Sequence, residues 1–190
     1  MRIDYNSPVI LTYTLMAVVV MAISSITGGL TTAGFFTVQP GMSMISPITY
    51  FRLVSHIVGH ANWGHLAGNF SLILLIGPLL EEKYGSALML FMILVTAFVT
   101  GVLNVVFFNT GLYGASGIVF MLILLSSLSR VKSGHIPLTF ILVVVLFLGK
   151  EIMDSLRPDG VSQFAHIAGG ICGSVFGFLK REKIPTIETE

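Results

Sequence analysis

Ser116 and His166 are the residues of this sequence whose chemistry stands out. Ser116 lies in the string Gly114-Ala115-Ser116-Gly117, which begins a predicted helix, and His166 lies in the last predicted helix. A serine hydroxyl is a poor nucleophile until a base removes its proton, and imidazole suits that role because it titrates near neutral pH. The free N–H groups and the dipole of a helix start favour developing negative charge. The two residues therefore predict nucleophilic serine catalysis.

Two further polar residues could complete such a site. His65 and Asn69 are four residues apart, so they share one face of a predicted helix, and both could donate hydrogen bonds to an oxyanion. The glycines at 114 and 117 permit close backbone approach. No Asp or Glu lies at this level of the predicted spans. We therefore infer a Ser116–His166 dyad, and Phe120, one turn after Ser116, offers an aromatic surface for the imidazole.

The composition places these residues in a membrane protein. The chain has 190 residues, of which 54% are hydrophobic and 10% are charged, against about 25% charged residues in a soluble domain. The length predicts one compact membrane domain over residues 1–183, with a disordered tail over residues 184–190. No basic block indicates nucleic acid, and the single Cys172 excludes an intramolecular disulfide and a cysteine-based metal cluster.

Six apolar segments are long enough, or nearly so, to cross a bilayer core of about 30 Å, which takes about 20 helical residues. Backbone in lipid must satisfy its own hydrogen bonds, so each segment is predicted to be a helix. The sequence thus predicts an all-α bundle of six transmembrane helices. The segments are Pro8 to Ile26, Trp63 to Leu80, Ser86 to Phe108, Ala115 to Ser129, Ile136 to Met153, and Ser162 to Lys180.

The segment between the first two predicted spans, residues 27–62, is long and rich in glycine and aromatic residues. It shows no clear helix of its own, and loops of this length are often functional. Aromatic side chains are favoured at the membrane interface, so we expect the segment to lie there.

Lysine and arginine residues set the predicted orientation, because cytoplasmic loops carry more of them. With the N-terminus inside, seven lie on one side and three on the other, which places both termini in the cytoplasm. The seven are Arg2, Lys83, Arg130, Lys132, Lys180, Arg181 and Lys183, and the three are Arg52, Lys150 and Arg157.

The charges that end the helices on the cytoplasmic side give a depth for each polar residue. Ser116 and His166 each lie 14 residues before such a charge, so at about 1.5 Å per residue both sit roughly 21 Å above the cytoplasmic boundary. His65 and Asn69 lie 16 and 12 residues before Glu81, at roughly 24 and 18 Å. All four occupy one layer, about 5–12 Å below the outer edge of the core, as a buried catalytic site would require.

A stripe of small residues follows His166 on nearly the same helix face, at Gly169, Gly173 and Gly177. Small residues spaced by four let membrane helices approach closely. This face is therefore expected to press against a neighbouring helix. If that neighbour carries Ser116, the hydroxyl and the imidazole could meet.

Each of these residues also has a structural interpretation. Serine and asparagine join membrane helices through hydrogen bonds, and a buried histidine can serve packing alone. His56, His60 and His65 could be read as a metal or haem site, but no acidic or thiol partner completes it. Arg52 and Glu81 are expected to make structural ion pairs or hydrogen bonds at the membrane edges. We expect neither a metal nor a cofactor.

The sequence resembles the bacterial rhomboid intramembrane proteases of the GlpG type over nearly its whole length. Each matching string is weak alone, but their order and helix placement are highly specific. The turn at residues 81–85 and the upstream Arg52, His56 and His60 are also similar. The strings are His65-Leu66-Ala67-Gly68-Asn69, Gly114-Ala115-Ser116-Gly117 and Ala165-His166-Ile167-Ala168-Gly169.

The resemblance implies a six-helix core with a water-filled cavity open to the outside and a first loop partly embedded beside the bundle. It implies Ser116 as nucleophile, His166 as general base, and an oxyanion hole of His65, Asn69 and the Ser116 backbone N–H. The family cleaves transmembrane segments of other membrane proteins near the outer membrane face, often at a small residue in a helix-destabilised stretch. It needs no cofactor, and the implied place of action is the bacterial inner membrane.

Two departures from the family pattern are visible. The commonest bacterial members have a Tyr that packs on the catalytic His where this chain has Phe120, so stacking survives and any hydroxyl role does not. The first predicted span begins near residue 8, so the soluble N-terminal domain of some relatives is expected to be absent. Gly169 and Gly173 match the close-packing stripe of the family.

The main alternative is a non-catalytic binder or chaperone of transmembrane helices on the same scaffold, which differs from a protease at Ser116 alone. A small transporter would predict discontinuous helices or an inverted repeat, and the sequence shows neither. Residues 109–113 and 157–163, on the outer side, are candidates for substrate access and its cover. The sequence leaves the natural substrate and the oligomeric state open.

Overall fold

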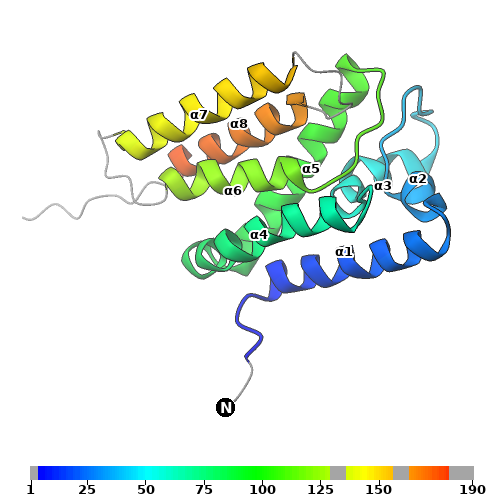
Figure 1. Ribbon diagram of the computed structural model, residues 1–190, viewed down its shortest axis with the longest axis horizontal. Coiled ribbons are helices and arrows are strands. Elements are labelled where there is room, and N and C mark those ends of the chain that lie inside the picture. The colour runs from blue at the N-terminus through cyan, green and yellow to red at the C-terminus, as the bar shows by residue number, and fades with distance from the viewer. Residues whose placement is uncertain (1–3, 129–135, 156–162, 180–190) are drawn as a thin grey trace, which may run out of the picture.

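The computed structural model describes residues 4–128, 136–155 and 163–179, with side chains described outside 147–163 (Figure 1). Within these ranges the chain is helical apart from loops and one isolated bridge, so the prediction of an all-α protein is confirmed. The predicted tail over 184–190 and the predicted access region over 157–163, apart from Gln163, lie outside the described residues. The helices are α1 (Pro8–Ile26), α2 (Leu30–Phe35), α3 (Pro47–Ser55), η1 (His56–Val58), α4 (Trp63–Tyr84), α5 (Ser86–Phe107), α6 (Ser116–Leu128), α7 (Leu138–Ser155) and α8 (Gln163–Leu179).

The six predicted apolar segments correspond to α1, α4, α5, α6, α7 and α8. The first has the predicted bounds, and the others agree within two residues, except that α4 runs past its predicted end to Tyr84. Gly85 stops α4, because its φ of 81° lies in the left-handed region that favours glycine. A new helix, α5, begins at the next residue.

The segment over residues 27–62 holds three short helices, α2, α3 and η1, so the expectation of no clear helix there was wrong. The helices α2 and η1, with six and three residues, are too short to show a helical period in sequence. Arg52 of α3 donates from its Nε and Nη2 to the carbonyl of Gly34, with an Nε distance of 3.1 Å. Ser55 donates to the carbonyl of Phe35 at 3.1 Å. These side chains hold the last turn of α2 against α3.

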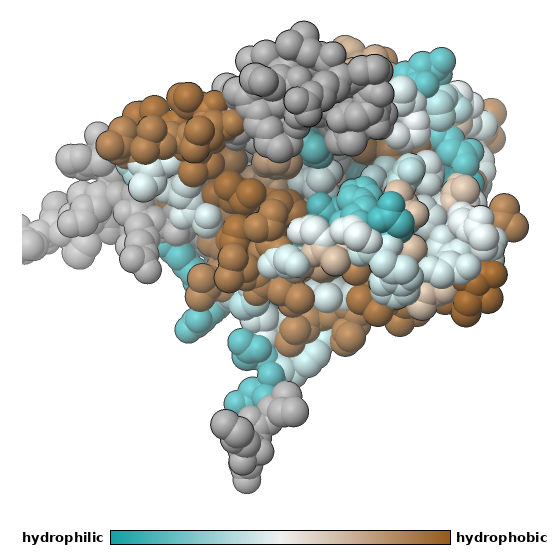
Figure 2. Space-filling model, in the orientation of Figure 1, coloured by the Kyte–Doolittle hydropathy of each residue, from teal (hydrophilic) through white to brown (hydrophobic). Residues whose placement is uncertain are grey.

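Three of the described helices, α1, α4 and α5, are long and apolar enough to cross a membrane. The helices α6 and α8 are apolar but shorter. Figure 2 shows hydrophobic side chains along the lower edge of α1 and over the C-terminal halves of α4 and α6, with more hydrophilic side chains where α4 and α6 begin. With these exposed hydrophobic side chains, this face of the bundle is suited to lipid.

The helix α6 lies inside the bundle and packs chiefly on α8, with α4 on another side. The helix α1 covers α4, and α3 packs on α5. The starts of α4, α6 and α8 lie at the same end of the bundle (Figure 1). Residues from the first turns of these three helices can therefore meet.

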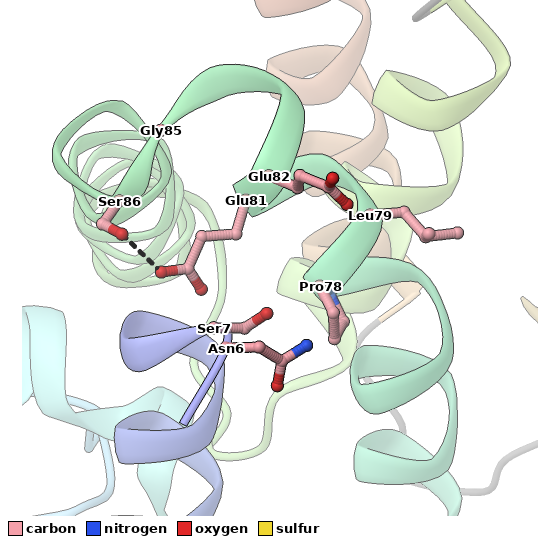
Figure 3. A pocket seen from close by; sticks show the side chains of 8 residues that line it. All are labelled: Asn6, Ser7, Pro78, Leu79, Glu81, Glu82, Gly85 and Ser86. Atoms are coloured by element: carbon pink, nitrogen blue, oxygen red, sulfur yellow. Dashed lines mark hydrogen bonds between the residues drawn. The ribbon is translucent and has the colours of Figure 1, made fainter. Parts of the chain in front are cut away.

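Glu81, near the other end of α4, holds the start of α1. Its two carboxylate oxygens accept hydrogen bonds from the backbone N–H groups of Val9 and Ile10, each at 3.0 Å. The hydroxyl of Ser86 also donates to it, at 2.7 Å (Figure 3). A helix start leaves its first N–H groups unpaired and favours a negative charge nearby. The 3% exposed Glu81 side chain thereby ties α1, α4 and α5 together.

Candidate active site

The first turns of α4 carry His65 and Asn69. The side chain of Asn62 caps this helix by accepting a hydrogen bond from the N–H of His65 at 2.8 Å. Such a cap satisfies one of the free donors of the helix start. His65 is half-buried and Asn69 is buried. The cap therefore fixes the turn from which both side chains project.

The backbone that leads into α6 is held by the segment before α4. Val38 and Leu112 exchange the two N–H···O hydrogen bonds of an antiparallel bridge, each 2.9 Å long. The N–H of Gly114 donates to the carbonyl of His56 at 2.9 Å. These bonds set the position of the chain immediately before Ser116.

Gly114 is where α4 and the start of α6 meet. Its φ of 119° favours glycine. A side-chain carbon placed on it would lie 2.9 Å from Cε1 of His65 and 3.9 Å from Nδ2 of Asn69. Both polar side chains of α4 therefore lie against the backbone next to Ser116.

Ser116 is the first residue of α6. The first hydrogen bond of the helix runs from the N–H of Val119 to the carbonyl of Ala115, at 3.0 Å. The N–H of Ser116 precedes that bond, so it has no partner within the helix. The side chain is half-buried. Ser116 thus combines a hydroxyl with a backbone donor at the positive end of a helix.

The neighbour of the glycine stripe on α8 is α6. A side-chain carbon on Gly117 would lie 3.3 Å from the carbonyl oxygen of Ala165. One on Gly169 would collide with the backbone of Gly117, and one on Gly173 with the backbone of Met121. The two backbones approach this closely because Gly169 and Gly173 of α8 carry no side chain at the contact.

His166 lies on this same interface and is 8% exposed. Its ring packs on the ring of Phe120, with centroids 4.6 Å apart and an angle of 39° between the planes. Phe120 follows Ser116 by one turn of α6, so the two share a face. Ser116 and His166 therefore lie on facing surfaces at the same level.

His56 and His60 lie behind this group and are almost fully buried. Burial lowers the pKa of each imidazole to about 4, so both are neutral at physiological pH. Nδ1 of His56 lies 3.3 Å from the carbonyl of Arg52, and its Nε2 lies 3.4 Å from the hydroxyl of Thr100. Across the described ranges, no three His, Cys, Asp or Glu side chains are placed to hold a metal ion.

The sequence alone suggests no role for His60 beyond the metal alternative. In the structure its Nε2 lies 3.1 Å from Nδ2 of Asn69 and 3.4 Å from the backbone nitrogen of Ala115. His60 precedes α4, so the period of that helix could not relate it to Asn69. The contact depends on how the chain turns at residues 59–62.

Comparison with known proteins shows to which family the chain belongs. A family model described as Rhomboid domain matches residues 47–183, which is more than half of the chain. The chain belongs to the rhomboid family. The matched part of this rhomboid runs from α3 through α8, and it contains Ser116, His166 and every histidine described above.

Three curated relatives are similar to this rhomboid. Rhomboid protease GlpG of Haemophilus influenzae is 26% identical over 133 residues, which cover 68% of this chain and 69% of the relative. Rhomboid-like protein 11, chloroplastic, of Arabidopsis thaliana is 26% identical over 150 residues, covering 68% and 52%. Rhomboid-related protein 1 of Caenorhabditis elegans is 32% identical over 157 residues, covering 74% and 43%. The matches confirm the resemblance to GlpG-type rhomboid proteases, while this rhomboid spans only about half of the plant and worm relatives.

Proposed function

We propose that this rhomboid is an intramembrane serine endopeptidase in which Ser116 is the nucleophile and His166 is the general base. One observation carries the proposal: the ring of Phe120, one turn after Ser116, packs on His166 at 4.6 Å. The hydroxyl of α6 and the imidazole of α8 thus project from facing surfaces at one level. A base in reach of a serine is what activation of that serine needs.

In the proposed reaction, Oγ of Ser116 attacks the scissile carbonyl carbon while His166 takes the hydroxyl proton. The carbonyl electron pair moves onto the oxygen, and the N–H of Ser116 with the side chains of His65 and Asn69 stabilises this oxyanion. The C–N bond breaks as His166 returns the proton to the leaving amine, which leaves an ester on Ser116. Water, deprotonated by His166, then attacks the ester, releases the acid product and restores the hydroxyl.

The surroundings of Gly114 support the oxyanion assignment. His65 and Asn69 both lie against Gly114, two residues before Ser116. A developing charge at the start of α6 would therefore meet these side chains and the helix dipole together. Fixed donors of this kind give acyl-transfer enzymes their largest single rate contribution.

We further infer that α1, α4, α5, α6, α7 and α8 span the bilayer as one domain over residues 1–183. The helices α6 and α8 have 13 and 17 residues, fewer than the roughly 20 that cross a full core. A short α6 that starts at Ser116 puts the hydroxyl below the outer surface, in a hollow that water enters from that side. The region over 27–62 then lies at the outer interface.

The similarity to GlpG of Haemophilus influenzae supports a location in the bacterial inner membrane. The excess of lysine and arginine on one side of these spans supports an orientation with both termini in the cytoplasm. The substrates are then transmembrane segments of other membrane proteins. A helical peptide bond is hidden by its own hydrogen bonds, so cleavage requires local unwinding of the substrate helix near the outer face. Substrates with small or helix-breaking residues there are expected to react fastest.

The test is cleavage of a single-pass membrane protein by the purified chain in detergent and in liposomes. Ser116→Ala and His166→Ala should each lower kcat by more than about a thousandfold without changing the thermal unfolding midpoint. A fluorophosphonate probe should label the wild type at Ser116 and fail on both variants. Unchanged cleavage by Ser116→Ala would overturn the mechanism. Substrate binding without Ser116-dependent cleavage would favour the binder or chaperone.

A further inference from the structure

His60 lies between η1 and α4 and is 1% exposed. Both of its ring nitrogens contact polar atoms. Nδ1 lies 3.1 Å from the carbonyl oxygen of Val58. Nε2 lies 3.1 Å from Nδ2 of Asn69 and 3.4 Å from the backbone nitrogen of Ala115.

These contacts fix the tautomer of the imidazole. The carbonyl of Val58 can only accept, so Nδ1 carries the proton and donates it there. The N–H of Ala115 can only donate, so Nε2 must accept. Burial lowers the pKa of His60 to about 4, which keeps the ring neutral and leaves the lone pair on Nε2 free for this role.

The tautomer in turn fixes the amide of Asn69. An Nε2 that accepts requires the NH2 end of the amide, not its oxygen, to face His60. The same nitrogen lies on the side toward Gly114, at 3.9 Å from a side-chain carbon placed there. Its second hydrogen can therefore point toward the backbone at Gly114, two residues before Ser116. An amide turned over would put its oxygen there and repel an oxyanion.

The ring of His60 is held in place by its neighbours. It contacts the rings of Phe70 and His65, with centroid distances of 5.6 and 5.1 Å. Phe70 in turn packs edge-on against Tyr13 of α1 at 5.0 Å, and the Tyr13 hydroxyl donates to the carbonyl of Ile57 at 2.8 Å. The imidazole therefore has little freedom to swing away from Asn69.

We propose that His60 is a positioning residue that orients the Asn69 amide and the peptide before Ser116 for oxyanion stabilisation. The inference rests on the proposed protease function. His60 touches no reacting atom in this scheme. It sets which end of the Asn69 amide faces the oxyanion. It also binds the N–H of Ala115, which fixes the position of the backbone from which the N–H of Ser116 donates to the oxyanion.

Two substitutions test the hydrogen-bond acceptor Nε2 and the donor Nδ1 of His60 independently. In His60→Gln, the amide oxygen is as many bonds from the backbone as Nε2 and can accept from Asn69 and Ala115. In His60→Asn, the amide nitrogen matches Nδ1 and can donate to Val58, but no acceptor reaches Asn69. We expect kcat to fall about tenfold to a hundredfold in His60→Asn with KM nearly unchanged, and to stay within about threefold in His60→Gln. Equal losses in both variants, no loss in His60→Asn, or a loss in KM alone would overturn the inference.

A double-mutant cycle separates positioning from general stability. In an Asn69→Ala background there is no amide left to orient, so His60→Asn should cost less than about threefold more. The same loss in both backgrounds would show a purely structural role and would overturn the inference. Each kcat is measured below the unfolding midpoint of that variant in detergent.

The wild type and Ser116→Ala are measured beside these variants. Wild-type protein that neither cleaves nor reacts with the fluorophosphonate would overturn the proposed function, and this inference with it. If the wild type cleaves in a Ser116-dependent way and His60→Asn has the same kcat, this inference alone would be overturned.

Discussion

The backbone of Gly117 occupies the space where a side chain on Gly169 would lie. The contact joins α6 to α8 one residue after Ser116 and three residues after His166. It sets the distance between the two helices at the level of the proposed dyad. Several expectations depend on this distance and on the polar groups around it.

Replacing Gly169 by Val should separate α8 from α6, because the added carbons meet backbone rather than a movable side chain. Overpacking of this kind costs about 1–3 kcal/mol, and a shift of about 1 Å between reacting groups can cost a hundredfold in rate. We expect a lower thermal unfolding midpoint and at least a tenfold loss of kcat. Gly68→Val in α4 is the matched control, since a side-chain carbon placed there would meet open space. Wild-type activity in Gly169→Val would contradict the role of the contact.

Removing the Asn69 amide should slow the chemical step and leave substrate binding nearly unchanged. Loss of one oxyanion donor typically lowers kcat about 10²–10³-fold. Asn69→Asp should be at least as slow as Asn69→Ala, because a carboxylate would stand beside the developing negative charge. The measurement is kcat and KM for one substrate across the wild type and both variants. A higher KM with an unchanged kcat would place Asn69 in substrate binding instead.

We expect activity to depend on the aromatic ring of Phe120, which contacts His166, and not on a hydroxyl at this position. An aromatic contact of this kind contributes about 0.5–1.5 kcal/mol, so Phe120→Leu should lower kcat about twofold to tenfold. Phe120→Tyr keeps the ring and should retain wild-type activity within about twofold. If Leu and Tyr behave alike, the ring does not orient His166.

Glu81→Gln should weaken the fold and spare the chemistry. The carboxylate accepts from two N–H groups of α1 and from Ser86, and an amide cannot accept at both ends. A buried donor left unpaired costs about 1–3 kcal/mol, so the unfolding midpoint in detergent should fall. Activity per folded molecule should be preserved, because Glu81 lies near the end of α4 opposite to His65 and Asn69. A selective loss of kcat with an unchanged midpoint would contradict this division.

The proposed orientation can be tested with reporters fused after residue 190. A fluorescent protein that matures only in the cytoplasm should fluoresce when it is fused at this position. An alkaline phosphatase that is active only in the periplasm should show no activity at the same position. The reason is the excess of lysine and arginine on the side of the C-terminus. The opposite pattern would place the C-terminus outside and would invert the proposed topology.

The positions of most helices depend on residues that are neighbours in the chain, so the sequence was enough to predict them. The bounds of α1 follow from one apolar run between Pro8 and the glycines after Ile26. The layer that holds Ser116 and His166 follows from a constant rise per residue and the charges that end each helix. The glycine spacing on α8 predicted a close contact with another helix but did not indicate which helix. A stripe of small residues says that a backbone lies nearby, and only packing decides which one.

The sequence by itself determined that the chain is helical and apolar, and which residue types could act as nucleophile and base. The tertiary structure decided that α6 is the partner of the glycine stripe, that residues 27–62 fold into short helices, and that His60 lies between Asn69 and the peptide before Ser116. The division has a physical reason. A helical period and a hydrophobic run are properties of neighbours in the chain, whereas hydrogen bonds between a loop and two helix starts exist only after the helices have packed.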